Sequence, residues 1–218
     1  MTAHALLDQL VKSPRFPSLM DRAQEILADE QRRREQFYES ITEGTKQEFI
    51  NGEIIVHSPV RLRHDQVSGA IYALLRAHVR RHELGHVGHE KLLVVLKRND
   101  YEPDVCFFSQ QKSAGFTPDQ MKFPPPDLAV EVLSESTEAT DRGVKFEDYA
   151  ANGVREYWIV DSDAQVIEQY ALAGDQYELK LKMNSGVLRS EAVPGFEVPV
   201  RALFDERENL AAMQRLLA

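Results

Sequence analysis

The stretch Asp127-Leu128-Ala129-Val130-Glu131-Val132-Leu133 decides the fold, because it places one carboxylate inside a short run that is otherwise apolar. In a β-strand, Ala129, Glu131 and Leu133 would share one face and the remaining apolar residues would share the other. Apolar residues on both faces are typical of a strand buried inside a sheet. A buried, unpaired carboxylate costs roughly several kcal/mol, so we expect a positively charged partner for Glu131.

A second acid, Asp104, lies in the similar run Tyr101-Glu102-Pro103-Asp104-Val105-Cys106-Phe107-Phe108. Two strands of one sheet can bring Asp104 and Glu131 side by side. Their hard oxygen ligands suit Mg²⁺ or Mn²⁺, and magnesium needs only one or two protein carboxylates because it keeps several waters. The two acids therefore predict a metal site at Asp104 and Glu131.

The residues after Glu131 predict a parallel βαβ unit. Ser136 or Thr137 can cap a helix that reaches about Ala151, and residues 154–161 are typical of the next strand. Such a unit is right-handed and places its two strands parallel in one sheet.

The other elements complete a mixed sheet. Asn51-Gly52 between two short apolar runs predicts a hairpin, and apolar residues at helical spacing predict a helix over 64–83. Residues 166–200 predict a C-terminal β meander. We expect residues 1–42 to form an N-terminal helical extension and residues 43–218 to form one domain. The fold class is α/β (α+β), with a mixed β-sheet core flanked by helices.

Composition limits the cellular context. The chain has 218 residues and is 43% hydrophobic, enough for a sizeable core. Its net charge of −9 argues against broad, charge-driven coating of nucleic acid, yet a nuclease with a locally basic groove stays possible. We see no apolar stretch of about 18 residues and no secretory signal, and the lone Cys106 allows no intrachain disulfide. We expect a cytoplasmic protein without a membrane span.

Lys145 is the candidate cation for this site. A helix that returns across the Glu131 strand can aim Lys145 at the two acids, where it would orient an attacking water or stabilise a charged transition state. The alternative is a structural ion pair with Asp141, one helical turn earlier.

A competing motif, His82-Glu83-Leu84-Gly85-His86, has the His-Glu-x-x-His spacing of zinc proteases. That mechanism needs both histidines one turn apart on an intact helix, and Gly85 lies where the helix should end. We therefore reject the protease. A structural zinc site is a second alternative that we also disfavour; its ligands would be His78, His82, His86 and His89.

Taken together, several segments resemble the Uma-type restriction endonuclease family of the PD-(D/E)XK restriction-endonuclease-like superfamily. The resemblance covers roughly residues 43–205. The segments that carry it are Gln47-Glu48-Phe49-Ile50-Asn51-Gly52-Glu53-Ile54, Ser58-Pro59, Arg63-His64, Glu102-Pro103-Asp104, Pro126 to Ser134, Asp141 to Lys145 with Tyr149, and Gly153 to Asp161.

The resemblance implies roles for individual residues. Asp104 would be the acid of the Pro-Asp half-motif, and Glu131 the acid of the Glu-x-Lys half-motif. Leu133 stands where the superfamily has its lysine, and Lys145 matches the helix lysine of the Uma-type pattern. Two further candidates for the site are Glu53 and His64, which otherwise would be a surface acid and a helix-start hydrogen bonder.

The function implied by the resemblance is that of a hydrolase, a Mg²⁺-dependent (or Mn²⁺-dependent) endonuclease that cleaves phosphodiester bonds, with DNA as substrate. A homodimer is expected because many enzymes of this fold cut duplexes as pairs. The alternative is a non-catalytic binding or assembly protein on a degenerate nuclease fold, since fold does not fix function. Leu133 and the acidic net charge motivate that alternative.

Overall fold

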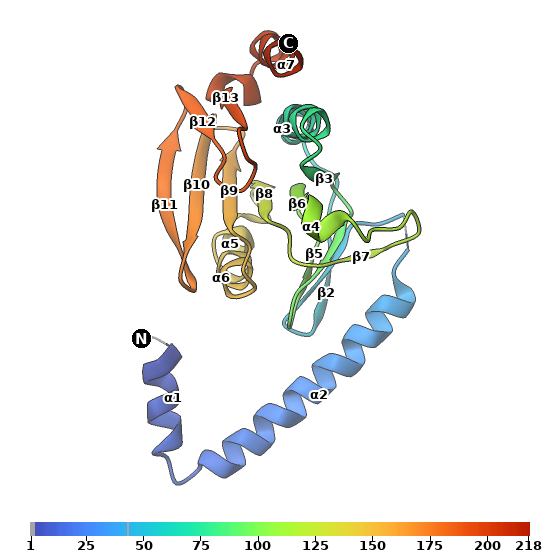
Figure 1. The fold of residues 1–218 in the computed structure, drawn as a ribbon. Coiled ribbons are helices and arrows are strands. Elements are labelled where there is room, and N and C mark those ends of the chain that lie inside the picture. The colour runs from blue at the N-terminus through green and yellow to red at the C-terminus, as the bar shows by residue number, and fades with distance from the viewer. Residues whose placement is uncertain (1–2, 43) are drawn as a thin grey trace.

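The structure is a computed structural model that describes residues 3–42 and 44–218 (Figure 1). The helices are α1 (Ala3–Val11), α2 (Phe16–Ser40), α3 (Leu62–Arg81), α4 (Gln110–Ser113), α5 (Glu138–Asp141), α6 (Val144–Ala151), the 3-10 helix η1 (Val200–Leu203) and α7 (Glu206–Leu217). The strands are β1 (Gln47–Ile50), β2 (Glu53–Val56), β3 (Gly85–His89), β4 (Leu93–Val95), β5 (Asp100–Tyr101), β6 (Val105–Ser109), β7 (Lys122–Phe123), β8 (Leu128–Val132), β9 (Glu156–Asp161), β10 (Val166–Ala173), β11 (Gln176–Met183), β12 (Val187–Arg189) and β13 (Glu197–Pro199).

A six-stranded sheet in the order β11-β10-β9-β8-β6-β3 forms the centre of the protein. The strands β8 and β9 are parallel, as the βαβ prediction requires, and β6 pairs antiparallel with β8. A five-stranded sheet, β2-β1-β5-β4-β7, contains the predicted hairpin, and β12 pairs with β13 in a small third sheet. The fold is therefore a mixed α+β fold, as predicted.

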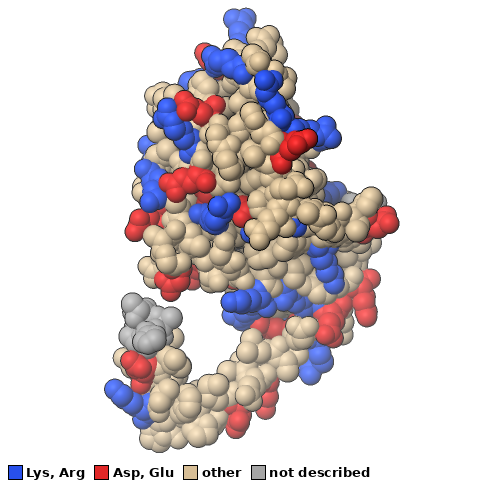
Figure 2. Space-filling model, in the orientation of Figure 1, with Lys and Arg blue, Asp and Glu red and all other residues tan. Residues whose placement is uncertain are grey.

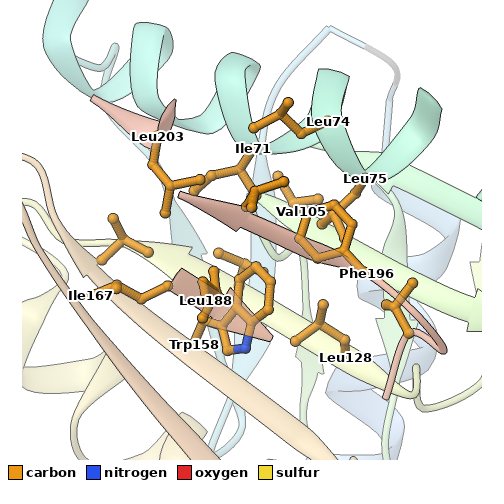
Figure 3. Packing of buried hydrophobic residues seen from close by; sticks show 14 of the residues in the cluster. Ile71, Leu74, Leu75, Val105, Leu128, Trp158, Ile167, Leu188, Phe196 and Leu203 are labelled. Atoms are coloured by element: carbon orange, nitrogen blue, oxygen red, sulfur yellow. The ribbon is translucent and has the colours of Figure 1, made fainter. Parts of the chain in front are cut away.

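The two faces of β8 contact different layers. Leu128, Val130 and Val132 belong to the core under α3, which also contains Trp158 and the C-terminal segment (Figure 3). Ala129 and Leu133 belong to a second core on the opposite face, where α6 packs. The predicted alternation is confirmed, and it places Glu131 on the α6 face.

The N-terminal helices α1 and α2 extend away from the rest of the chain (Figure 1). Only the C-terminal part of α2 is anchored. Phe37 is fully buried beside Phe49, and Arg34 donates to the carbonyl oxygens of Leu96 and Asn99 and forms an ion pair with Asp100. The predicted domain boundary at residue 43 falls outside the described residues.

The predicted helix over 64–83 ends earlier than expected. Its last residue is Arg81, and Gly85 begins β3 instead of capping the helix. Gly85 has a φ of +141°, and a Cβ there would lie 2.1 Å from the Phe108 carbonyl oxygen, so the close approach of β6 requires glycine. The break separates His82 from His86, which lies on β3, so the two histidines do not share a helix.

Three other predictions need correction. The helix expected from residue 137 to Ala151 is divided into α5 and α6 at Gly143, where an added Cβ would lie 2.7 Å from the Ala139 carbonyl oxygen. The expected loop over 109–126 contains α4 and β7. Asp104 precedes β6 instead of lying inside the strand. Within the described residues, no helix is long and apolar enough to cross a membrane.

Candidate active site

The candidate site is a cleft of about 550 Å³ near the junction of the two larger sheets. Its lining includes Lys46, which precedes β1 of one sheet, and Asp104, which precedes β6 of the other, together with Glu131 of β8. Its lining includes both predicted metal ligands and a group of potential cations, which are Lys46, His57, Arg61, Arg63, His64, Lys91 and Lys145. The same lining contains the acids Glu90, Asp104, Glu131, Glu135, Asp141 and Asp163, so the cleft combines cations and acids in near balance.

Strand pairing brings the two predicted acids together. Val105 of β6 lies opposite Val130 of β8. Because the two strands are antiparallel, the residue before Val105, Asp104, lies opposite the residue after Val130, Glu131. The backbone N–H of Val132 donates to Asp104 Oδ2 at 2.8 Å, which fixes the Asp104 carboxylate beside β8. The sequence-based pairing of these two acids is confirmed in position.

The Asp104 carboxylate is buried between two cationic groups. Lys46 Nζ lies 2.9 Å from Oδ1, and His64 Nε2 lies 3.2 Å from Oδ2. Burial by itself would raise the pKa of Asp104, but Lys46 and His64 hold that pKa well below its usual range. The same contact favours protonated His64, whose pKa is raised against the opposing effect of burial. Asp104 is therefore ionised and available as a ligand near neutral pH.

Lys145 lies at the centre of a second, more deeply buried cluster. Its Nζ is 3.0 Å from Glu48 Oε1, 3.1 Å from Glu131 Oε1 and 3.2 Å from Asp141 Oδ1. The predicted contact with Glu131 and the alternative contact with Asp141 are both present. Of these contacts, the one to Glu131 Oε1 is a hydrogen bond, and those to Glu48 and Asp141 are ion pairs.

One lysine charge does not neutralise three carboxylates, and their pKa values diverge accordingly. Burial raises the pKa of Glu131 to about 8, against the lowering effect of Lys145. Burial also raises the pKa of Asp141. For Glu48 the effect of burial is overcome by Lys145 and by His57, whose Nε2 lies 2.9 Å away, and the pKa is about 2. Burial and the crowding of three carboxylates around one lysine therefore favour uptake of a proton by Glu131 or Asp141.

The two second-rank candidates have different positions. His64, at the start of α3, lies in the cleft and contacts Asp104. Glu53 is exposed at the start of β2 and lines a neighbouring pocket, so the structure does not bring it to Asp104.

Sequence reasoning did not identify Lys46 or Glu48 as site residues. Phe49 packs on Phe37 of α2, so the alternation of β1 turns Glu48 to the other face, where it is fully buried. That alternation was the available signal for Glu48. Nothing in the local sequence identifies Lys46, which precedes β1 and reaches Asp104 only through the docking of the hairpin.

The donor set at the cleft fits a hard divalent cation. Asp104 and Glu131 offer carboxylate oxygens, the ligand type of Mg²⁺ and Mn²⁺. Across residues 3–42 and 44–218, no group of three or more His, Cys, Asp or Glu side chains is placed to hold a metal ion. An ion with only two protein carboxylates would complete its coordination with water, which is the usual state of protein-bound magnesium.

The fold and the cleft together define a restriction-endonuclease-like α+β protein. The Uma2 family, described as "Putative restriction endonuclease", matches residues 34–201, and the chain belongs to this family. The family description is that of a nuclease, a hydrolase that acts on nucleic acid.

Three individual proteins are similar to the chain. Two proteins of Synechocystis sp. are similar to the chain and are both described as uncharacterized. One, sll1609, is 30% identical over 135 residues, which is 60% of this chain and 75% of the relative. The other, slr1290, is 32% identical over 161 residues, which is 71% of this chain and 75% of the relative. A crystal structure described as a putative nuclease belonging to DUF820 from Anabaena variabilis superimposes with a TM-score of 0.67 at 16% identity, over 78% of this chain and 96% of that chain, which shows the shared fold.

Proposed function

We propose that the protein is a Mg²⁺- or Mn²⁺-dependent endonuclease that hydrolyses phosphodiester bonds in DNA. The observation that carries the proposal is that Asp104 and Glu131 lie opposite each other, one position beyond the Val105–Val130 pair, in a cleft whose lining includes cationic side chains. Asp104 and Glu131 would hold the ion, which when bound would polarise the phosphodiester and activate a water.

The chain's own residues support substrate binding at this cleft. Lys46 and His64 flank Asp104, and Arg61 and Arg63 line the same cleft. Positive groups of this kind favour a phosphate backbone. Figure 2 shows Lys and Arg side chains interspersed with Asp and Glu over the visible face, so the acidic net charge does not make that face uniformly acidic.

Lys145 has a positioning role in this proposal. It is almost completely buried, and its three carboxylate contacts hold Glu131 in place and neutralise part of the acid cluster. Tyr149 adds a hydrogen bond of 3.0 Å to the same Glu131 oxygen. This fixed orientation leaves the Glu131 carboxyl beside Asp104 in the cleft lining.

The test is cleavage of supercoiled plasmid in Mg²⁺ and in Mn²⁺ by the wild type and by Asp104→Ala. Asp175→Ala, which changes an exposed acid in the β10–β11 turn, is the matched control. We expect nicking by the wild type and the control, and at least a hundredfold loss in Asp104→Ala, of the order found when a key electrostatic group is removed. Equal activity in Asp104→Ala would contradict the assignment of the site.

A non-catalytic binding protein is the second candidate, and one observation favours it. The acids of the cleft are already paired with the chain's own cations, Asp104 with Lys46 and Glu131 with Lys145. Calorimetric titration of the wild type with Mn²⁺ separates the two candidates. A nuclease requires binding that is lost in Asp104→Ala, whereas the binding protein predicts no Mn²⁺ binding at this cleft.

A further inference from the structure

The two lysines of the candidate site differ in what they can contact. The Lys145 side chain is 2% exposed, and its three carboxylate partners lie within 3.2 Å of Nζ. To contact a substrate oxygen, this buried ammonium group would have to move away from the acids that it neutralises, which is strongly unfavourable. Lys145 is thus committed to the acid cluster.

Lys46 is placed differently. Its side chain is 20% exposed, it lines the cleft, and among the described residues it forms a single ion pair, with Asp104 at 2.9 Å. Because an ammonium group has three N–H donors, one carboxylate leaves donors for another oxygen.

We propose that Lys46 is the cation that contacts a backbone phosphate of the substrate in this cleft, and that Lys145 makes no such contact. The proposal rests on the proposed function, because it takes the Asp104 cleft as the place where the phosphodiester binds. The proposal assigns the phosphate contact to Lys46, which precedes β1, and not to Lys145 of α6. A group that approaches Asp104 from the cleft meets the Lys46 ammonium beside that carboxylate.

The experiment measures DNA binding and is independent of cleavage. The affinity for a short duplex is determined by fluorescence anisotropy between 50 and 300 mM salt (roughly), with Ca²⁺ in place of Mg²⁺. Each phosphate contact contributes about 0.9 to the slope of log K against log salt. Lys46→Met should lower the magnitude of this slope by about one and weaken binding about eightfold at roughly 0.1 M salt.

Three other variants make the comparison specific. Lys46→Arg retains the charge and should retain the slope. Lys145→Met should leave the slope unchanged. Lys180→Met alters a lysine on β11 that is 40% exposed and pairs with Glu178, and it should also leave the slope unchanged. If Lys145→Met does not fold, the comparison of Lys46→Met with Lys180→Met still decides the role of Lys46.

The possible outcomes separate this inference from the proposed function. A wild type that cleaves DNA, together with an unchanged slope in Lys46→Met, would overturn the inference and leave the proposed function intact. A wild type that binds without cleaving would contradict the nuclease, while the slope of Lys46→Met would still support or refute the phosphate contact. A wild type that neither binds nor cleaves DNA would overturn both. A lower slope in Lys145→Met alone would reverse the roles of the two lysines.

Discussion

Replacing Glu131 by glutamine should change how stability depends on pH. The Glu131 side chain is 3% exposed, and its Oε1 accepts hydrogen bonds from Tyr149 at 3.0 Å and from Lys145 at 3.1 Å. Burial raises its pKa from 4.5 to about 8. Glutamine has nearly the shape of the protonated acid and keeps an oxygen acceptor for both donors, but it has no proton to lose.

The sign follows from the direction of the pKa shift. Below pH 4.5 the folded and unfolded states both hold the proton, and Glu131 contributes its full stability. Between pH 4.5 and about 8 the unfolded state loses the proton while the folded state keeps it, so the wild type loses stability as pH rises. One pKa unit corresponds to about 1.4 kcal/mol, which makes the total loss on the order of 3 to 5 kcal/mol.

Urea unfolding at intervals from pH 5 to pH 9 measures this effect. The free energy of unfolding of Glu131→Gln should be close to that of the wild type at pH 5 and should exceed it by a few kcal/mol at pH 9. Glu178→Gln, a control at an acid that is 65% exposed, should follow the wild type at every pH. A constant difference between Glu131→Gln and the wild type over this range would refute the reasoning, because it would mean that Glu131 titrates as it does in the unfolded chain.

Three further substitutions test the energetics of the fold by urea unfolding. Arg34→Met should cost about 3 to 5 kcal/mol, because it leaves the fully buried Asp100 carboxylate without its cation, and retention of wild-type stability would contradict the role of this anchor. Lys145→Met should cost a similar amount at pH 8 and less at pH 5, where the acids around it can take up protons; an equal loss at both pH values would argue against a buried acid cluster. Leu74→Ala, in the core under α3, should cost about 2 to 5 kcal/mol, whereas Leu210→Ala at a 61% exposed position should change stability by less than about 0.5 kcal/mol.

Patterns that act within one element were predictable from the sequence. The alternation of β8 assigned its two faces correctly, and Asn51-Gly52 located the hairpin. Asn51 and Gly52 both have positive φ, of 51° and 84°, as the tight turn requires. The proximity of Asp104 and Glu131 was also accessible, because both acids belong to short apolar runs that can form two strands of one sheet.

Contacts between distant elements were not predictable in the same way. Glu48 and Lys46 reach the site because the hairpin docks on β5, with Phe49 opposite Asp100 and Phe37 of α2 behind it. None of these contacts follows from local periodicity. The break at Gly143 was missed for a related reason, since the approach of the Ala139 carbonyl oxygen appears only in the folded chain.

Lys145 places a cation beside Glu131 in a chain that has leucine at residue 133. Leu133 and Glu131 are two residues apart and share the face of the sheet that α6 covers. A lysine at residue 133 would reach Glu131 along that face. Lys145 enters from α6 above the same face and reaches Glu131 Oε1 at 3.1 Å, while Leu133 packs in the second core.

The position of Lys145 on α6 also determines which acids it contacts. From α6 it is within 3.2 Å of Glu48 and Asp141 as well, so the cation beside Glu131 is enclosed by acids and almost completely buried. In the proposed site a cation has two tasks, which are to neutralise the buried acids and to contact the substrate phosphate. In this chain the two tasks are expected to be divided, with Lys145 holding the acids and Lys46 facing the substrate, and the salt dependence of DNA binding distinguishes this division from a single-lysine site.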